Sequence, residues 1–336
     1  MTQKGAFMVF LSDTVRQHLH PPRAELFYSR GMPDDPRLGD LVHRGHVPAM
    51  PLDAILLGVP QDIGVQRNRG RPGAAEAPHA IRQALYRLTP DFGAARGLDH
   101  LRLADLGDIN TTGRTLEDIH ALQERCVAEL LQHAIHTIIV LGGGHDIAYP
   151  NAAALARQHA CGILVFDAHP DVRPLLNGQA HSGSAFRQVL EELNFPAHRL
   201  AYIGLQPFAL ARAHREYLQS RGAHLCSLAE LSLRGMKTVL PELFATISEN
   251  GTLPVYVSCD LDAIPAAFAP GVSAPATVGI SPEEFLWAAE FLGTQPTVRL
   301  LDIAELNPRF DLDQRTARLA ATFIATFLAG IALRTP

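Results

Sequence analysis

The chain has 336 residues, 47% of them hydrophobic, which indicates a folded protein with a sizeable core and excludes a disordered chain. Its 29 Lys and Arg residues against 34 Asp and Glu residues leave a formal net charge of −5, with no strongly basic block. We therefore expect no nucleic-acid partner, and small molecules are the predicted ligands.

The four cysteines are scattered in mostly apolar or helical stretches, without C-x-x-C spacing: Cys126, Cys161, Cys226 and Cys259. Buried, reduced thiols in the cytoplasm are the expected state. The apolar run at residues 6–11 is too short for a signal-peptide core or a membrane span, and no later run approaches ~20 apolar residues. We expect a cytoplasmic protein with no membrane contact.

Residues 1–50 are rich in Pro, His and charge, and they predict an irregular N-terminal arm that packs over the domain or serves a subunit contact. Residues 51–336 show no linker-like break and predict a single catalytic domain. Strands are predicted at 55–59, 101–106, 137–141, 162–166, 200–204, 224–227, 255–258 and 298–303. Helices are predicted near 78–88, 116–133, 147–158, 185–193, 208–220, 236–248, from 281, and at 313–333. This alternation predicts an α/β fold with a parallel sheet covered on both faces.

The predicted strand that ends at Phe166 is followed by Asp167-Ala168-His169-Pro170-Asp171. If this segment is extended, its two aspartates and its histidine share one side and face one point. Ligands in parallel sheets collect beyond the carboxyl ends of strands, so a metal site is expected here. Taken alone, the segment could also be an ordinary polar turn, with the histidine bonded to a backbone carbonyl.

Chemically similar residues follow three more predicted strands. His145 closes a Gly142-Gly143-Gly144 run, which lacks the order and the Lys-Ser/Thr of a phosphate-binding loop. Asp260 and Asp262 leave another strand, where buried carboxylates are costly unless a cation binds them. Glu305 follows the last strand. Because all these strand ends should meet at one edge of the sheet, we expect one shared site.

Six candidate metal ligands result: His145, Asp167, His169, Asp171, Asp260 and Asp262. A single zinc ion needs only three or four protein ligands, and calcium would not favour histidines. Six donors rich in carboxylate suit two first-row divalent ions, and Mn²⁺ matches them best by ligand hardness. Two such ions about 3.5–4 Å apart can share carboxylates and lower the pKa of a bridging water, so hydrolysis is the predicted reaction.

The motifs G-G-G-H-D (142–146), D-A-H-P-D (167–171), S-C-D-L-D (258–262) and E-L-N-P (305–308) resemble those of the ureohydrolases, the arginase and agmatinase family. The resemblance covers roughly residues 55–330. It implies a three-layer α/β/α fold with a mostly parallel eight-stranded sheet, a centre of two Mn²⁺ ions per chain and, commonly in this family, a homo-oligomer. By this resemblance, one ion is held by His145, Asp167, Asp171 and Asp260, and the other by Asp167, His169, Asp260 and Asp262.

The resemblance also implies catalytic roles. Asp171 would orient the attacking hydroxide and Glu305 would meet the amidine-like group of the substrate. Within the family, the chain is most similar to the formimidoylglutamases, which hydrolyse N-formimidoyl-L-glutamate to glutamate and formamide in histidine degradation. The run after Asp262 lacks the D-x-x-D-P continuation of arginases, and residues 64–78 and 269–275 also resemble this branch. The alternatives are a guanidino-acid hydrolase that releases urea and a metal-binding scaffold without catalysis.

Four positions bear on the substrate, which we expect to be an acidic amidine. Arg173 occupies the place where arginases have an asparagine that touches the substrate carboxylate, and a guanidinium could grip a carboxylate with two hydrogen bonds. Arg67 or Arg69 could assist it, in the loop that also contains Asn68. The alternative for Arg173 is a structural salt bridge.

A proton-shuttling histidine is the last expected feature. Where guanidine-cleaving relatives carry this histidine, Ser182 stands in its place, as in formimidoylglutamases, and His181 is displaced by one residue. His181 is therefore a weak candidate for the shuttle. A surface or supporting histidine is the alternative.

Overall fold

The computed structural model describes residues 11–44, 51–91, 97–133 and 135–334. Its strands form one sheet in the order β1-β4-β3-β5-β10-β9-β6-β7-β8, and β2 pairs with β4. The eight strands from residue 52 onward all run parallel to one another. The prediction of a mostly parallel sheet is confirmed, but within the described residues the sheet has ten strands and not eight. The bounds of the parallel strands from residue 52 onward are β3 (Leu52–Gly58), β4 (Leu103–Ile109), β5 (Ile135–Leu141), β6 (Gly162–Phe166), β7 (Leu200–Leu205), β8 (His224–Ser227), β9 (Val255–Asp260) and β10 (Val298–Ala304).

The N-terminal arm adds short elements to one edge of this sheet. Of its residues, 1–10 and 45–50 lie outside the described part of the chain. The rest forms α1 (Asp13–Arg16), β1 (Leu19–His20), α2 (Leu38–Leu41) and β2 (His43–Arg44). β1 pairs antiparallel with β4 and β2 pairs parallel with it. The sequence pattern, which predicts an irregular arm, does not indicate these strands.

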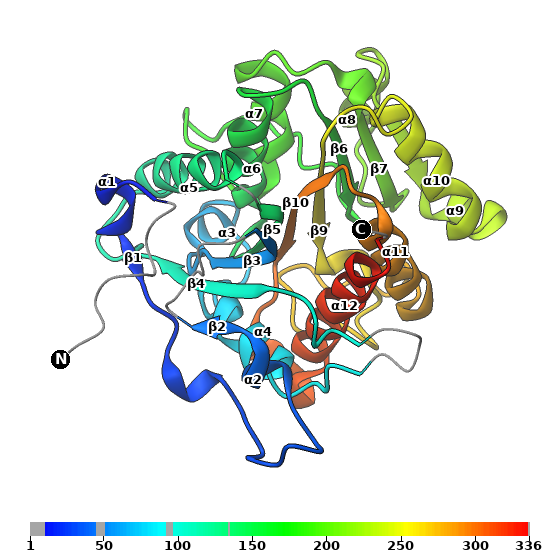
Figure 1. The fold of residues 1–336 in the computed structure, drawn as a ribbon. Coiled ribbons are helices and arrows are strands. Elements are labelled where there is room, and N and C mark those ends of the chain that lie inside the picture. The colour runs from blue at the N-terminus through cyan, green and yellow to red at the C-terminus, as the bar shows by residue number, and fades with distance from the viewer. Residues whose placement is uncertain (1–10, 45–50, 92–96, 134, 335–336) are drawn as a thin grey trace.

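Helices cover both faces of the sheet, as Figure 1 shows. One face packs against α4 (Ala77–Leu85), α9 (Leu228–Arg234), α10 (Met236–Ile247), α11 (Pro282–Thr294) and α12 (Arg315–Ala332). The other face packs against α5 (Leu116–Leu131), α6 (Ala148–Ala156), α7 (Ala185–Glu192) and α8 (Arg212–Gln219). The fold is therefore the predicted three-layer α/β/α arrangement. α9 and the short α3 (Ile63–Arg67) are helices that the sequence analysis does not predict.

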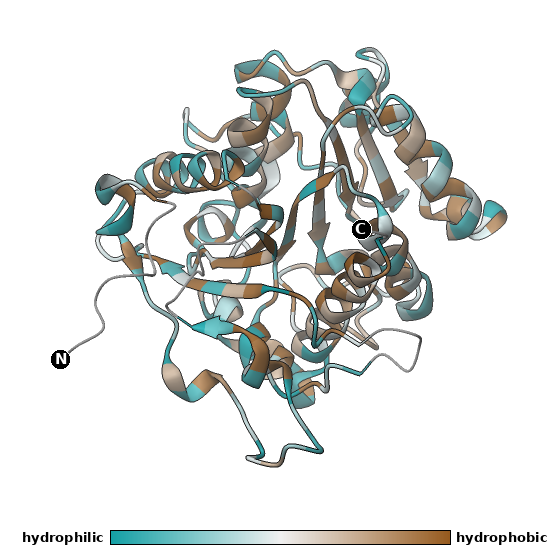
Figure 2. Cartoon of the chain, in the orientation of Figure 1, coloured by the Kyte–Doolittle hydropathy of each residue, from teal (hydrophilic) through white to brown (hydrophobic). Residues whose placement is uncertain are grey.

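The strands are mostly apolar because each face of the sheet has its own core (Figure 2). In β5, Ile139 and Leu141 pack into one core, whereas Ile138 and Val140 pack into the other. All four side chains are at most 1% exposed. The candidate metal ligands lie at or beyond the carboxyl ends of these strands.

All four cysteines are free and buried, as predicted. Among the described helices, none is both long and apolar enough to cross a membrane.

Candidate metal centre

Four adjacent strands in the middle of the sheet, β5, β10, β9 and β6, carry the candidate ligands at their carboxyl ends. His145 lies beyond β5 and Glu305 beyond β10. Asp260 is the last residue of β9, and Asp167 directly follows β6. Because neighbouring parallel strands end at the same edge, side chains from distant parts of the sequence converge there.

The segment after β6 reaches the site through a turn, so its predicted extended conformation is wrong. Asp171 has a left-handed backbone with φ of 45°. The amide of His169 donates a hydrogen bond to Asp167 Oδ1 over 2.6 Å, and Tyr202 donates one to the carbonyl of Pro170 over 2.9 Å. These contacts fold the segment back, and its three ligand-type side chains still face the same region.

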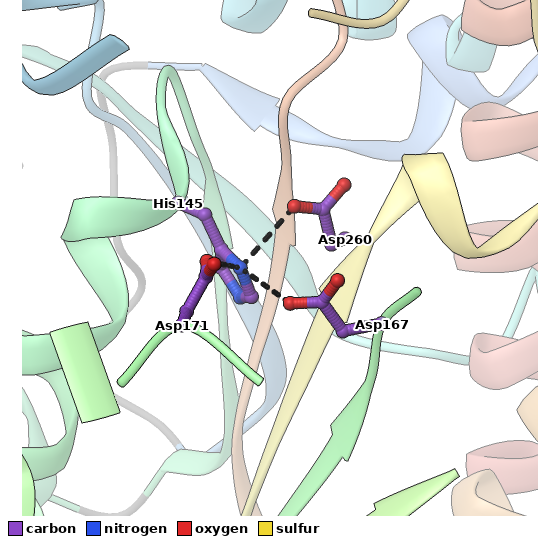
Figure 3. Close-up of side chains that lie close together, drawn as sticks. All are labelled: His145, Asp167, Asp171 and Asp260. Atoms are coloured by element: carbon purple, nitrogen blue, oxygen red, sulfur yellow. Dashed lines mark hydrogen bonds and ion pairs between the residues drawn. The ribbon is translucent and has the colours of Figure 1, made fainter. Parts of the chain in front are cut away.

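The first cluster surrounds Nδ1 of His145 (Figure 3). This nitrogen lies 3.0 Å from Asp171 Oδ2, 3.2 Å from Asp167 Oδ2 and 3.2 Å from Asp260 Oδ2. One ligand atom from each of the four residues lies within 4.8 Å of all the others. His145 is fully buried. Three carboxylates around one imidazole nitrogen form a donor set for a divalent cation.

The second cluster joins Asp167, His169 and Asp262. Nδ1 of His169 lies 2.9 Å from Asp262 Oδ2 and 3.6 Å from Asp167 Oδ1. Asp167 belongs to both clusters, with Oδ2 in one and Oδ1 in the other, as a bridging carboxylate would. Asp260 joins only the first cluster within this distance, although the sequence resemblance assigns it to both ions.

The electrostatics of the clusters fit a cation. Asp167 is fully buried, and its Oδ2 accepts no hydrogen bond from the described residues. Burial, and then the charges of Asp171 and Asp262, raise the pKa of Asp167 to about 6. Burial and the charges of Asp262 and Asp167 likewise raise the pKa of Asp260 well above its usual range. Bound cations would offset the repulsion between these carboxylates and provide the partner that Asp167 Oδ2 lacks.

The imidazoles respond to the same carboxylates. Burial disfavours the charged ring of His145, but hydrogen bonds to Asp167, Asp171 and Asp260 outweigh it and raise the pKa of His145 well above its usual range. The charge of Asp262 raises the pKa of His169 to about 12. Both shifts show how strongly this edge of the sheet attracts positive charge.

Residues outside the clusters fix the orientation of His145. Nε2 of His145 lies 2.9 Å from Oγ of Ser258, and this hydroxyl donates to Asp302 Oδ1, also over 2.9 Å. Since the Ser258 hydroxyl uses its proton on Asp302, it can only accept from the His145 ring, so Nε2 carries the proton. When a cation replaces the proton at Nδ1, this nitrogen can offer its lone pair to the cation. The sequence analysis did not single out Ser258 or Asp302; the only signal was an aspartate inside an apolar strand.

The Gly142-Gly143-Gly144 run allows the chain to pass close to another loop. A Cβ atom on Gly143 would lie 1.6 Å from the carbonyl oxygen of Gln61. The amide of Gly144 donates to that same carbonyl over 3.1 Å. The glycines therefore serve close backbone packing that places His145.

Glu305 joins the site from β10 with a left-handed backbone of φ 67°. Its Oε1 accepts a hydrogen bond from the amide of His145 over 2.8 Å, and its own amide donates to the carbonyl of Gly143 over 2.9 Å. Burial raises the pKa of Glu305 to about 8. A buried carboxylate beside the clusters can pair with a cationic group of a ligand.

A pocket opens above the clusters. Besides donors from both clusters, Arg173, Asn68, Ser182, His214 and Glu305 line it. Asn68 links two of them: its Nδ2 donates to Ser182 Oγ over 3.0 Å, and its Oδ1 accepts from Arg173 Nη1 over 3.1 Å. Arg173 makes no ion pair with a carboxylate of the described residues, so the structure does not support a structural salt bridge. Its guanidinium is held at the pocket with donors to spare.

Two predicted site residues are placed elsewhere. Arg67 pairs with Glu117 over 2.6 Å and donates to the carbonyl of Ala180 over 3.0 Å, and it does not line the pocket. His181 is 4% exposed and uses both ring nitrogens on the backbone: Nδ1 accepts from Gly183, and Nε2 lies 3.1 Å from the carbonyl of Pro174. Because both ring nitrogens contact the backbone, the geometry favours the alternative of a supporting histidine that holds the loop.

His214, in contrast, lines the pocket but was missed by the sequence analysis. It lies on α8 among polar residues, a setting that gives no sign of a ligand site. Burial, followed by the charge of Arg173, lowers the pKa of His214 below its usual range.

A parallel α/β/α sheet with clustered carboxylates and imidazoles at its carboxyl edge, and with a buried glutamate beside them, fits a metal-dependent hydrolase. A model of the Arginase family matches residues 52–330, and the chain belongs to this family, so it is a metal-dependent hydrolase of amidino or guanidino C–N bonds.

Three relatives are similar over most of their length. Formimidoylglutamase from Halalkalibacterium halodurans is 32% identical over 262 residues, which are 77% of this chain and 82% of that protein. A crystal structure of formiminoglutamase from Trypanosoma cruzi with Mn²⁺₂ has a TM-score of 0.82 and 34% sequence identity to this chain. The match covers 90% of this chain and all of that chain. Formimidoylglutamase from Bacillus subtilis has a TM-score of 0.85 and 25% identity, and covers 92% of this chain and 96% of that one.

Proposed function

We propose that the chain hydrolyses N-formimidoyl-L-glutamate to L-glutamate and formamide, a step of histidine degradation, with two Mn²⁺ ions as cofactors. The observation that carries this proposal is Arg173. It is the only arginine or lysine among the described residues that line the pocket, and it lies above a site that suits cations. An amidine with carboxylates at its far end matches both features. The names of the similar proteins support the same substrate.

The substrate would be bound at both ends. Arg173, held by Asn68, would form charge-assisted hydrogen bonds with a carboxylate of the glutamyl part. Glu305 would accept hydrogen bonds from the cationic formimidoyl group, while its Oε1 keeps the bond from the amide of His145. Ser182 offers a further polar contact between these ends. This arrangement would place the amidine carbon over the two clusters.

His145, Asp167, Asp171 and Asp260 would hold one ion, and Asp167, His169 and Asp262 the other, with Asp260 a candidate to join them. When bound, the ions would supply Lewis acidity and make hydroxide available near neutral pH. Asp171 lines the pocket from the first cluster, so its carboxylate would orient the attacking water and hold its proton. A cytoplasmic location and a homo-oligomeric state stay predictions.

The test is a substrate panel with Mn²⁺-loaded protein: N-formimidoyl-L-glutamate, agmatine, arginine and guanidinobutyrate. We expect glutamate and formamide in equal amounts from the first compound, and little turnover of the others. An Asp171→Asn variant serves as the control that assigns turnover to this pocket. Urea from guanidinobutyrate without formamide from the first compound would instead identify a guanidino-acid hydrolase. Two bound metals without turnover of any compound would indicate a scaffold.

A further inference from the structure

A second cavity, of about 500 Å³, lies at the opposite edge of the sheet, where the central strands begin. His136 stands near the amino end of β5 and Arg299 near the amino end of β10, its neighbour in the sheet. Arg334, just beyond α12, and His133 also line the cavity. Four basic side chains thus surround a space that is separated from the metal centre by the length of the strands.

The two arginines of this cavity contact backbone carbonyls. Arg334 donates to Gly293 over 2.7 Å and to Gln295 over 2.9 Å. Arg299 donates to Ile135 over 3.2 Å, whereas its Nε is buried without a hydrogen-bond partner. Both therefore retain donors, and among the described residues no carboxylate forms an ion pair with either guanidinium.

The nearest carboxylate identified at this edge is already used. Asp53 accepts hydrogen bonds from Nε and Nη2 of Arg102, and it lies 3.4 Å from Nδ1 of His136. Burial lowers the pKa of Arg299, and burial together with the charge of Arg299 lowers the pKa of Arg334 to about 10 despite Asp53. Burial thus disfavours the charge of both guanidinium groups, and a bound anion would offset this effect.

We propose that this cavity binds a small divalent oxyanion, a dicarboxylate or a phosphate monoester, with Arg299 and Arg334 as its main ligands. Two guanidinium groups present planar sets of donors that suit carboxylate and phosphate oxygens. The volume lies within the range of small-molecule sites, roughly 300–1,000 Å³. The site is distinct from the substrate pocket, and the inference does not depend on the identity of the substrate.

Isothermal titration calorimetry of the full-length, Mn²⁺-loaded protein with succinate and, separately, with inorganic phosphate tests this site. Succinate stands for the dicarboxylates and phosphate for the phosphate esters, so the arm that binds identifies the class. We expect one site per chain that persists in an Arg173→Gln variant. Arg299→Gln and Arg334→Gln should each weaken binding about tenfold or more, since each removes charge-assisted hydrogen bonds.

Arg318→Gln is the matched control, because Arg318 is an exposed arginine near the other end of α12, and it should bind with unchanged affinity. If Arg299→Gln lowers the melting temperature sharply, its loss of binding reflects unfolding. The anion affinities of Arg334→Gln and Arg299→Lys are then compared with that of the parent instead. Binding of neither anion overturns the proposal, as does binding that both glutamine variants retain. A change in oligomeric mass in these variants, with no anion bound by the parent, would assign the cavity to a carboxylate of a second copy.

Discussion

At the residue scale, the centre depends on how His145 is held as much as on the ligands themselves. Its ring contacts three carboxylates through Nδ1 and one hydroxyl through Nε2. The Ser258 hydroxyl in turn donates to Asp302, which also accepts from Tyr256 and Asn151. This chain of bonds defines which nitrogen faces the cation site, and it lies wholly inside the protein.

Ser258→Ala should weaken Mn²⁺ binding by roughly tenfold to a hundredfold, because the ring then loses the partner that fixes its orientation. Competition with a metal-sensitive dye measures the affinity. Ser232→Ala, at an exposed serine whose Oγ bonds only its own helix in the contacts described, is the matched control. Unchanged Mn²⁺ affinity in Ser258→Ala would show that the ring is held by packing alone.

Arg173→Gln should raise the KM for N-formimidoyl-L-glutamate by about tenfold to a hundredfold and leave kcat within a few-fold. The reason is that a charge-assisted contact with the substrate carboxylate is worth roughly 1.5–3 kcal/mol in the ground and transition states alike. Steady-state kinetics separate the two constants. Arg69→Gln should change neither constant, because Arg69, which the sequence offers as a possible helper of Arg173, is exposed and does not line the pocket. Equal KM values for Arg173→Gln and the parent would remove Arg173 from substrate binding.

At the element scale, the alternation of strands and helices was predictable because most strands are apolar runs that end in polar residues. The order of the strands was not. β10 comes last in the sequence but lies between β5 and β9, and this position brings Glu305 to the amide of His145. The turn at Asp171 was also beyond prediction, because an aspartate in a left-handed conformation depends on contacts from β7 and α7.

α4 is joined to β4 by a buried network around Arg82, which is 1% exposed. Arg82 donates to both oxygens of Asp105 and to Asp108, and Tyr86 also donates to Asp105. Burying these charges is tolerated because each has a partner.

Arg82→Ala should lower the free energy of unfolding by about 3–5 kcal/mol, since it leaves the buried carboxylate of Asp105 without its counter-ion. Urea denaturation of the metal-loaded protein measures this. Arg87→Ala, which removes an exposed guanidinium stacked on Tyr28 just after the same helix, should cost about 1 kcal/mol or less. Similar losses for the two variants would contradict a special role for the buried pair.

At the scale of the whole molecule, the fold holds mutually repelling carboxylates at one edge of its sheet. Asp167 and Asp260 have raised pKa values because burial and like charges disfavour their ionised forms. The family, the six donors and Glu305 could be recognised from the sequence. The position of His181 outside the pocket could not be recognised from the sequence, because its hydrogen bonds to Pro174 and Gly183 depend on the loop conformation.

Removal of metal should therefore destabilise the protein. At a free Mn²⁺ concentration of 100 times Kd, each bound ion adds about 2.7 kcal/mol to the free energy of unfolding. Differential scanning calorimetry should show a lower Tm in a chelator and recovery on adding Mn²⁺ back. A His145→Asn variant should respond less than the parent. An identical Tm with and without chelator would mean that the clusters do not bind metal in the folded state.

The most direct test of the account is anomalous diffraction from a crystal of the Mn²⁺-loaded protein, recorded at the manganese absorption edge. The account predicts two anomalous peaks per chain, one among His145, Asp167, Asp171 and Asp260 and the other beside His169 and Asp262, with Asp167 between them. A single peak, or no peak among these six side chains, would contradict it.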